Sequence, residues 1–190
     1  MNVQDLAVCG RGSADRPSPE LFAASARTTI RYADTAAWTT ATAIARAIDA
    51  HEDVIRDVRH HVGVAVVSDH GPSDTMAQVQ ANAEEGFSSP LRYAAASPGS
   101  LAGVPCIALG FRGPTLNFGM RPAAGVPIGL LVGSAWLARG TALALVMASF
   151  VAGADGTQSA RALLLMPAGA FPESRALDSQ TLDWLAQVER

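Results

Sequence analysis

The sequence between Ala123 and Val151 reads AAGVPIGLLVGSAWLARGTALALVMASFV. Its first part, Ala123–Arg139, is apolar on nearly every face of a helix, which predicts a helix buried in the centre of the protein. Gly140 is of the residue type that commonly ends a helix. Thr141–Val151 then has the continuous apolar character of a strand that is buried on both faces. A buried helix followed directly by a buried strand indicates stacked layers of helix and sheet.

The same alternation extends toward the N-terminus. Val62–Ser68, which reads VGVAVVS, predicts another strand of the kind found inside parallel sheets. Apolar residues three and four positions apart predict a helix within Ser25–Ala50, and Asp34 or Thr35 is placed to cap its stronger part. These segments predict helices and strands that follow one another in turn.

The remaining segments complete an α/β pattern. They are a strand at Met1–Val8, a loop at Gly10–Pro19, a helix at Thr75–Glu85, a loop at Gly86–Pro98, a short helix at Ser100–Phe111, strands at Thr115–Gly119 and Ala160–Met166, and a last helix at Ser179–Arg190 capped by Asp178 or Ser179. The order favours a layered α/β fold whose mixed, mostly parallel sheet packs on a buried central helix. The sequence contains no repeat and no linker, so one domain is expected over residues 1–190.

Composition narrows the possible functions. Of the 190 residues, 49% are hydrophobic and 16% are charged, which suggests that part of the surface is covered by a partner or a second copy. The net charge is -3 and there is no basic run, so nucleic acid is not expected as a partner. Polar residues such as Arg139 interrupt the apolar stretch Val126–Val151, so no membrane span is expected. The N-terminus lacks a signal-peptide pattern, and Cys9 and Cys106 form no motif, so a cytoplasmic protein with reduced thiols is expected.

One part of the chain carries a family resemblance. A loop with Pro90 and Tyr93 precedes a small-residue helix at Ser100–Gly110, and Gly-Phe-Arg-Gly-Pro-Thr-Leu follows at Gly110–Leu116. A short strand and an alanine- and glycine-rich helix come next. This pattern, over Ser88–Val151, resembles ketosynthases, the condensing enzymes with the thiolase fold. The resemblance implies that residues 1–190 form one ketosynthase-like N-terminal half-domain with a thiolase-like fold.

The sequence departs from the ketosynthase pattern at the nucleophile. In the family a cysteine stands at the N-terminus of the buried helix, where the helix dipole favours a thiolate and backbone N–H groups can stabilise an oxyanion. Counting along the motif from Gly113 puts Pro122 at that position, and proline has neither a nucleophile nor an N–H. The family's second half, which carries two catalytic histidines, has no room in 190 residues. Condensing activity is therefore not expected.

The chain-length factor is a ketosynthase homologue of a similar kind, since it lacks the cysteine and pairs with an active ketosynthase. In that homologue small residues follow the nucleophile elbow, the sharp turn into the buried helix at which the family's cysteine stands. Ala123-Ala124-Gly125 is similar here. The resemblance further implies that the short strand before the elbow pairs across a dimer twofold, which makes Leu116 and Phe118 the candidate interface residues. No cofactor is expected beyond the phosphopantetheine arm of an acyl carrier protein.

Several other side chains are candidates with an ordinary alternative. Arg121, with Ala123 beside it at the helix start, is a candidate for binding a phosphate or carboxylate, or else a surface arginine. Asp69 and His70 follow a strand at the edge where α/β sites tend to lie, and they offer a base with its orienting carboxylate, or else a solvated turn. Cys106 is either a displaced nucleophile or a small buried hydrophobe. The other histidines have no convincing metal-ligand spacing, so no metal is expected.

Three functions remain open from the sequence. The first is a non-catalytic, chain-length-factor-like subunit that pairs with a ketosynthase or with itself and contacts acyl carrier protein in polyketide or fatty-acid-type biosynthesis. The second is a repurposed acyl-thioester enzyme, a hydrolase, acyltransferase or dehydratase, that uses residues other than the lost cysteine. The third is a structural or regulatory binding module, because a fold alone does not fix a function.

Overall fold

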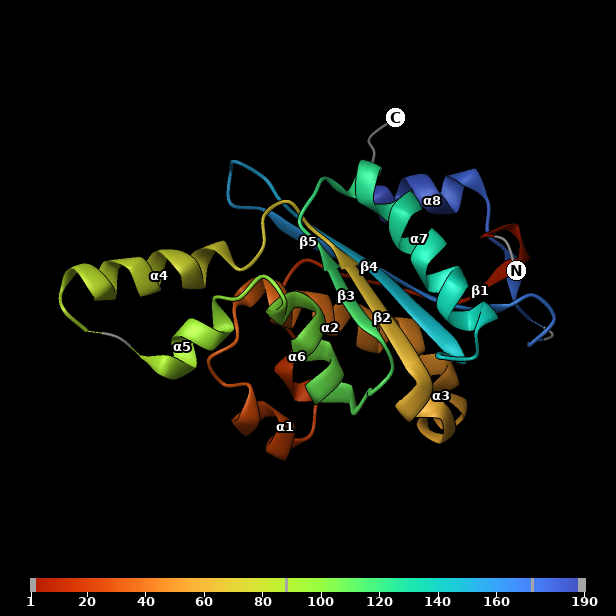
Figure 1. Ribbon diagram of the computed structural model, residues 1–190, viewed down its shortest axis with the longest axis horizontal. Helices are drawn as coiled ribbons and strands as arrows, with labels where there is room; N and C mark the ends of the chain where they lie inside the picture. The colour runs from red at the N-terminus through yellow and green to blue at the C-terminus, as the bar shows by residue number, and fades with distance from the viewer. Residues whose placement is uncertain (1–2, 88, 172, 188–190) are drawn as a thin grey trace.

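A computed structural model describes residues 3–87, 89–171 and 173–187, and in it one six-stranded sheet lies between two layers of helices (Figure 1). The strands are β1 Leu6–Ala14, β2 Val62–Val67, β3 Thr115–Phe118, β4 Ala144–Ala152, β5 Gln158–Pro167 and β6 Arg175–Ala176. The helices are α1 Ala24–Thr29, α2 Thr35–Ile48, α3 Glu52–Val58, α4 Ser73–Glu84, α5 Pro90–Ala95, α6 Ser100–Leu109, α7 Pro122–Ala138 and α8 Ser179–Ala186. Single 3-10 turns lie at Val3–Asp5, Pro19–Leu21, Asp49–His51 and Arg59–His61.

The strands follow the order β3-β2-β4-β5-β1-β6 across the sheet. β2 runs parallel to both β3 and β4, whereas the β4–β5, β5–β1 and β1–β6 pairs are antiparallel. The predicted α/β class and mixed sheet are confirmed. Three of the five described strand pairs are antiparallel, because β4 and β5 form a hairpin and β1 lies beside β5 in the opposite direction. β3 lies at one edge of the sheet.

Helix α2 covers one face of the sheet and is capped as predicted. The Asp34 carboxylate accepts a hydrogen bond from the backbone N–H of Ala36 at 2.7 Å. Its second oxygen accepts the backbone N–H of Thr75 at 2.8 Å, in the first turn of α4. One buried carboxylate, 41 residues before Thr75 in the sequence, therefore fixes the beginnings of two helices.

Strand β1 corrects the predicted loop at Gly10–Pro19, because residues 10–14 belong to the strand. A Cβ at Gly10 or Gly12 would overlap the backbone carbonyl oxygens of Ala47 and Ala43 in α2. These two glycines therefore allow α2 to approach the strand closely. Glycine inside a strand often marks such a close approach of another backbone. A glycine-rich stretch read without its partner helix looks like a turn.

Helix α7 covers the opposite face of the sheet, where Figure 1 shows it beside α8. Gly125, Gly129 and Gly133 lie four residues apart and face the sheet, where a Cβ on each would press on Val67, Met147 and Leu145. The outer face of α7 is also apolar but is exposed, and it includes Ala123, Ala124, Pro127, Ile128 and Leu131. The inner face of α7 is buried, whereas no other described element covers the outer face, which a half-domain of the ketosynthase type is expected to leave open to a partner.

Helix α8 is fastened to the sheet by polar contacts. Asp178 caps it by accepting a hydrogen bond from the backbone N–H of Thr181 at 2.7 Å, as predicted, and hydrogen bonds from Thr181 lower the pKa of the Asp178 carboxyl. Ser149 in β4 donates a short hydrogen bond to the carbonyl oxygen of Leu185, and Arg161 donates to that of Trp184 at 2.7 Å. The helix ends at Ala186, before the predicted end, and residues 188–190 lie outside the described part.

Helices α4 and α5 form an arm that projects from the body on the side of β3 (Figure 1). α5 lies where a loop was predicted at Gly86–Pro98. The sequence carries a signal for it, since Ser89 caps the helix and Pro90 occupies its first position. Among the described residues, none of the helices has the length and apolar character that a bilayer-spanning segment needs.

Candidate functional site

The carboxyl ends of β2 and β3 meet the beginning of α7, and this is where the family's active site is expected. The backbone N–H of Ser68 donates to the carbonyl oxygen of Phe118 at 3.0 Å, which joins the ends of the two strands. The chain leaves β2 through Asp69 and His70 and leaves β3 toward Arg121. Three of the predicted site residues therefore lie on adjacent segments at one edge of the sheet.

Pro122 is the first residue of α7 and is buried. Proline suits that position because its ring fixes the backbone angle that a helix needs and its missing N–H would have no partner inside the helix. The N–H groups of Ala124 and Gly125 both donate to the carbonyl oxygen of Arg121 at 3.0 Å, so they are already used. Arg121 itself has ordinary backbone angles, φ -57° and ψ 136°. The helix start therefore offers no nucleophile and no strained turn that would expose one.

Arg121 and Asp69 form a loose pair, with 4.0 Å between Arg121 Nε and Asp69 Oδ2. Their side chains are 88% and 46% exposed, so water screens the attraction strongly. Ala123 is exposed beside them on the outer face of α7. Because the pair with Asp69 is loose and Arg121 is mostly exposed, the Arg121 guanidinium can bind an anionic group that approaches from solvent.

His70 belongs to a tight turn rather than to an acid–base pair. The hydroxyl of the buried Ser68 accepts the backbone N–H groups of His70 and Gly71 at 3.1 and 3.2 Å. The His70 side chain is exposed and lines a groove between α4 and α5, and the residues that line this groove include neither Asp69 nor Arg121. Asp69 and His70, the predicted carboxylate and base, are thus neighbours in the sequence but do not line the same groove.

Neither cysteine is prepared for nucleophilic attack. Burial raises the pKa of the Cys106 thiol above its ordinary value, and the thiol lies 3.5 Å from the Thr115 hydroxyl, between α6 and β3. Burial also raises the pKa of Cys9. A raised pKa keeps a thiol protonated at neutral pH, whereas attack requires the thiolate.

The two candidate interface residues of β3 differ in their surroundings. Phe118 is half-buried and packs with the residues beneath α7, where its ring approaches Gly129. Leu116 is 36% exposed at the open edge of the sheet. The outer side of β3 has no neighbouring strand within the described chain, so Leu116 is the better of the two for contact with a partner.

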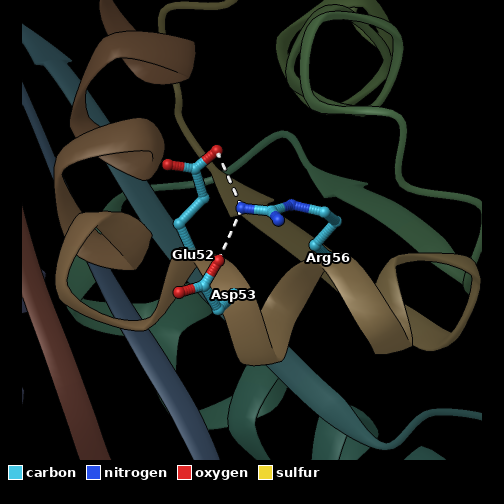
Figure 2. A network of polar contacts seen from close by, with 3 residues as sticks. All are labelled: Glu52, Asp53 and Arg56. Atoms are coloured by element: carbon cyan, nitrogen blue, oxygen red, sulfur yellow. Dashed lines mark hydrogen bonds and ion pairs between the residues drawn. The ribbon is translucent and has the colours of Figure 1, made fainter.

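Two hollows lie away from the start of α7. One, of about 390 Å³, opens beside α2 and α3 and is lined by arginines and carboxylates as well as apolar residues. Arg56 on its rim already pairs with Asp53 at 2.7 Å and lies 3.9 Å from Glu52, with all three side chains well exposed (Figure 2). This network is a solvated helix face. Across the described ranges, no three His, Cys, Asp or Glu side chains are grouped as metal ligands.

The second hollow is the groove between α4 and α5, of about 830 Å³, and sequence reasoning did not find it. It is lined mainly by small and apolar residues of α4, by Tyr93 in α5 and by the segment that follows α5, including Met76, Ala77, Val79, Ala83, Tyr93 and Ala96. The groove exists because α5 lies beside α4. The sequence predicted a loop at Gly86–Pro98 in place of α5, and such a loop gives no helix to form the second wall.

No protein-family model and no curated protein matches the sequence, but solved structures match its fold. A ketosynthase of the bacillaene polyketide synthase from Bacillus amyloliquefaciens has a TM-score of 0.62 and 12% identity, over 88% of this chain and 42% of that chain. A β-ketoacyl synthase from Burkholderia phymatum has a TM-score of 0.65 and 13% identity, over 86% of this chain and 59% of that one. The chain thus spans between two fifths and three fifths of these enzymes.

A third match differs in length. It is a chain of the complex of the ketosynthase ApeO with its chain length factor ApeC from Xenorhabdus doucetiae, with a TM-score of 0.61 and 14% identity. The alignment covers 96% of this chain and 90% of that chain, so the two are of similar size. The three matches agree on architecture, and the chain has the thiolase-like fold of the ketosynthases.

Proposed function

We propose that the chain is a non-catalytic, chain-length-factor-like subunit that pairs with a ketosynthase and contacts an acyl carrier protein in cytoplasmic polyketide or fatty-acid-type biosynthesis. The observation that carries this proposal is Pro122 at the start of α7. The fold is that of a condensing enzyme, but the position that would hold the nucleophile holds a residue that has no reactive group and no N–H.

The length of the Xenorhabdus match supports this proposal. A chain of similar size with the same fold occurs in a complex of a ketosynthase with its chain length factor. A chain with only this part of the fold therefore has a precedent inside an assembly of the proposed kind.

The open edge of β3 is the proposed pairing site. An edge strand presents unpaired backbone N–H and C=O groups that can bind a strand of another chain. Leu116 is exposed there, and the edge carries no charged residue from Thr115 to Phe118 that would oppose pairing. An edge strand without charged residues that would prevent pairing is expected in a subunit whose partner covers that edge.

Arg121 is the proposed contact for the phosphate of a carrier protein's phosphopantetheine arm. Its guanidinium is exposed at the helix start, and the helix dipole there favours an anion. Asp69 is loosely paired with it and would compete with the phosphate. Removing Asp69 should therefore strengthen, and removing Arg121 weaken, contact with the carrier.

The test is to purify the tagged chain from its host and to identify by mass spectrometry what comes with it. A ketosynthase in near-equal amount is the expected result, and Leu116→Lys should release it because a charge on an edge strand opposes pairing. Leu143→Lys, an exposed leucine outside β3, is the matched control and should leave the pair intact. A chain that purifies alone and turns over acyl thioesters would instead support the repurposed enzyme.

Restoring the nucleophile by itself should not create a condensing enzyme. Pro122→Cys places a thiol at the helix start, but the two catalytic histidines that the ketosynthase resemblance implies belong to the family's second half, and His70 lines a groove that does not include Arg121. We expect no condensation product from an acyl carrier protein substrate, measured by mass spectrometry. Product formation by the purified single chain would contradict the non-catalytic role.

A further inference from the structure

The arm formed by α4 and α5 has almost no core of its own. Thr75 is the one buried residue of α4, and α5 has none. Met76, Phe87, Leu91 and Tyr93 are 49%, 60%, 56% and 71% exposed. Such large apolar side chains gathered on a short two-helix projection are unusual on a surface that faces only water. Helices of twelve and six residues also gain little stability from their own hydrogen bonds.

The arm begins and ends beside the open edge of β3. α4 follows β2, the strand that pairs with β3, and α5 precedes α6, which packs on both β2 and β3. Asp34 holds the first turn of α4 through the N–H of Thr75. The arm therefore has a fixed root and projects past the sheet on the side where a partner strand would lie (Figure 1).

The size of β3 shows that pairing along this edge needs more surface. A stable interface buries about 800 Å² and about 20–30 residues on each partner. β3 has four residues, of which Leu116 is the large apolar one exposed at the edge. The arm supplies four further exposed apolar side chains and a groove of about 830 Å³ that is large enough to receive several side chains.

We infer that the α4–α5 arm is the second half of the surface that binds the ketosynthase partner: apolar side chains of the partner fill the groove between α4 and α5, and Leu91 and Tyr93 pack against the partner next to β3. This inference rests on the proposed function, since it concerns the same partner. The aromatic ring of Tyr93 at the groove wall is of the residue type that carries much of the binding energy in protein interfaces.

The test uses Leu91→Ser with Tyr93→Ser in the full chain. Both side chains are exposed, so circular dichroism and the melting temperature should stay unchanged. The probe is the host ketosynthase that co-purifies with the intact chain, purified separately, and the readout is the dissociation constant from calorimetry. We expect the double variant to bind at least about tenfold more weakly. Leu21→Ser, at 51% exposure on the rim of the other hollow, is the control and should bind within about twofold of the original chain.

The outcomes separate the two proposals. If the double variant binds the ketosynthase as the original chain does, while Leu116→Lys does not, the arm inference is wrong and the proposed function stands. If no ketosynthase binds the original chain, both are wrong. If the double variant loses self-association in sedimentation but keeps ketosynthase binding, the arm contacts a second copy and the inference is also wrong.

Discussion

Helices α2 and α7 cover opposite faces of one sheet, and the less apolar of the two is the better buried. In α2, eleven of 14 residues are buried, among them Thr39, Thr40 and Thr42. Their hydroxyls donate to carbonyl oxygens four residues earlier at 2.8–2.9 Å, so their polar groups are satisfied inside the helix. In α7, eight of 17 residues are buried although nearly all are apolar. An apolar helix sequence therefore indicates a surface that has to be buried, but the residues that bury it need not belong to the same chain.

The largest effect is expected where α2 meets β1. Gly12→Ala puts a methyl group against the carbonyl oxygen of Ala43 and 2.5 Å from the amide nitrogen of Ala47, and backbone atoms cannot move aside singly. We expect a loss of about 3 kcal/mol or more in the free energy of unfolding, measured by urea denaturation. Gly103→Ala in α6 is the matched control, because nothing lies within 4 Å of its added methyl group. A Gly12→Ala protein with the original denaturation midpoint would contradict the close α2–β1 contact.

A smaller loss is expected at the cap of α2. Asp34→Ala removes the acceptor for the N–H groups of both Ala36 and Thr75, and a lost helix cap costs about 1–2 kcal/mol. Because Thr75 opens α4, hydrogen exchange at its amide should also become faster. Asp34→Asn keeps one acceptor oxygen and should lose less. Equal stability of the alanine variant and the original chain would show that the cap is not used.

On the inner face of α7, Gly133→Ala should cost about 1–2 kcal/mol. Its added methyl group would overlap the side chain of Leu145, which is fully buried and branched. Gly129→Ala meets instead the flexible end of Met147 at 2.5 Å, and methionine adapts to such changes more easily. The difference in melting temperature between the two variants measures how tightly α7 is seated. If Gly129→Ala is the more harmful, Met147 is held more rigidly than Leu145 and the expected adaptability of its side chain is wrong.

The smallest effect is expected on the outer face of α7. Leu131 is 64% exposed, so Leu131→Ser should change the free energy of unfolding of the isolated chain by about 0.5 kcal/mol or less. Thermal denaturation of the isolated Leu131→Ser variant beside the original chain checks this. A large loss in the isolated chain would mean that α7 is covered from within, and the contrast with α2 would disappear.

The sequence predicted the elements whose pattern is local. Val62–Val67 and Ala144–Ala152 are buried strands, α7 and α6 lie close to their predicted ranges, and Asp34 and Asp178 are caps, because apolar runs and capping side chains act on their own neighbours. Residues 10–14 were predicted as a loop because the helix that requires their glycines lies some 30 residues away in the sequence. The apolar pattern of α7 did not show which of its faces this chain covers; the exposed outer face, with Leu131 64% exposed, was implied only by the length of the chain relative to a whole ketosynthase.

The candidate site was predicted in position more than in geometry. Pro122 stands at the start of α7, as the motif implied, and Asp69, His70 and Arg121 lie near one edge of the sheet. His70 lines the groove between α4 and α5 instead of the start of α7, after a turn closed by the Ser68 hydroxyl, and the residue types alone do not specify this turn. The groove in the arm depends on α5, whose cap at Ser89 was overlooked beside two prolines.

The place of β1 in the sheet has a consequence for how the protein is made. β1 pairs with β5, in which Leu6 lies opposite Pro167 and Ala14 opposite Ala160, so β1 cannot pair until these later residues have been synthesised. At the usual rate of synthesis, roughly ten seconds or more separate the two strands as they leave the ribosome. During that time the glycine-rich β1 has no strand beside it, and such distant pairings form slowly. Of the described strands, the one that is synthesised first is thus among the last to find its partner in the sheet.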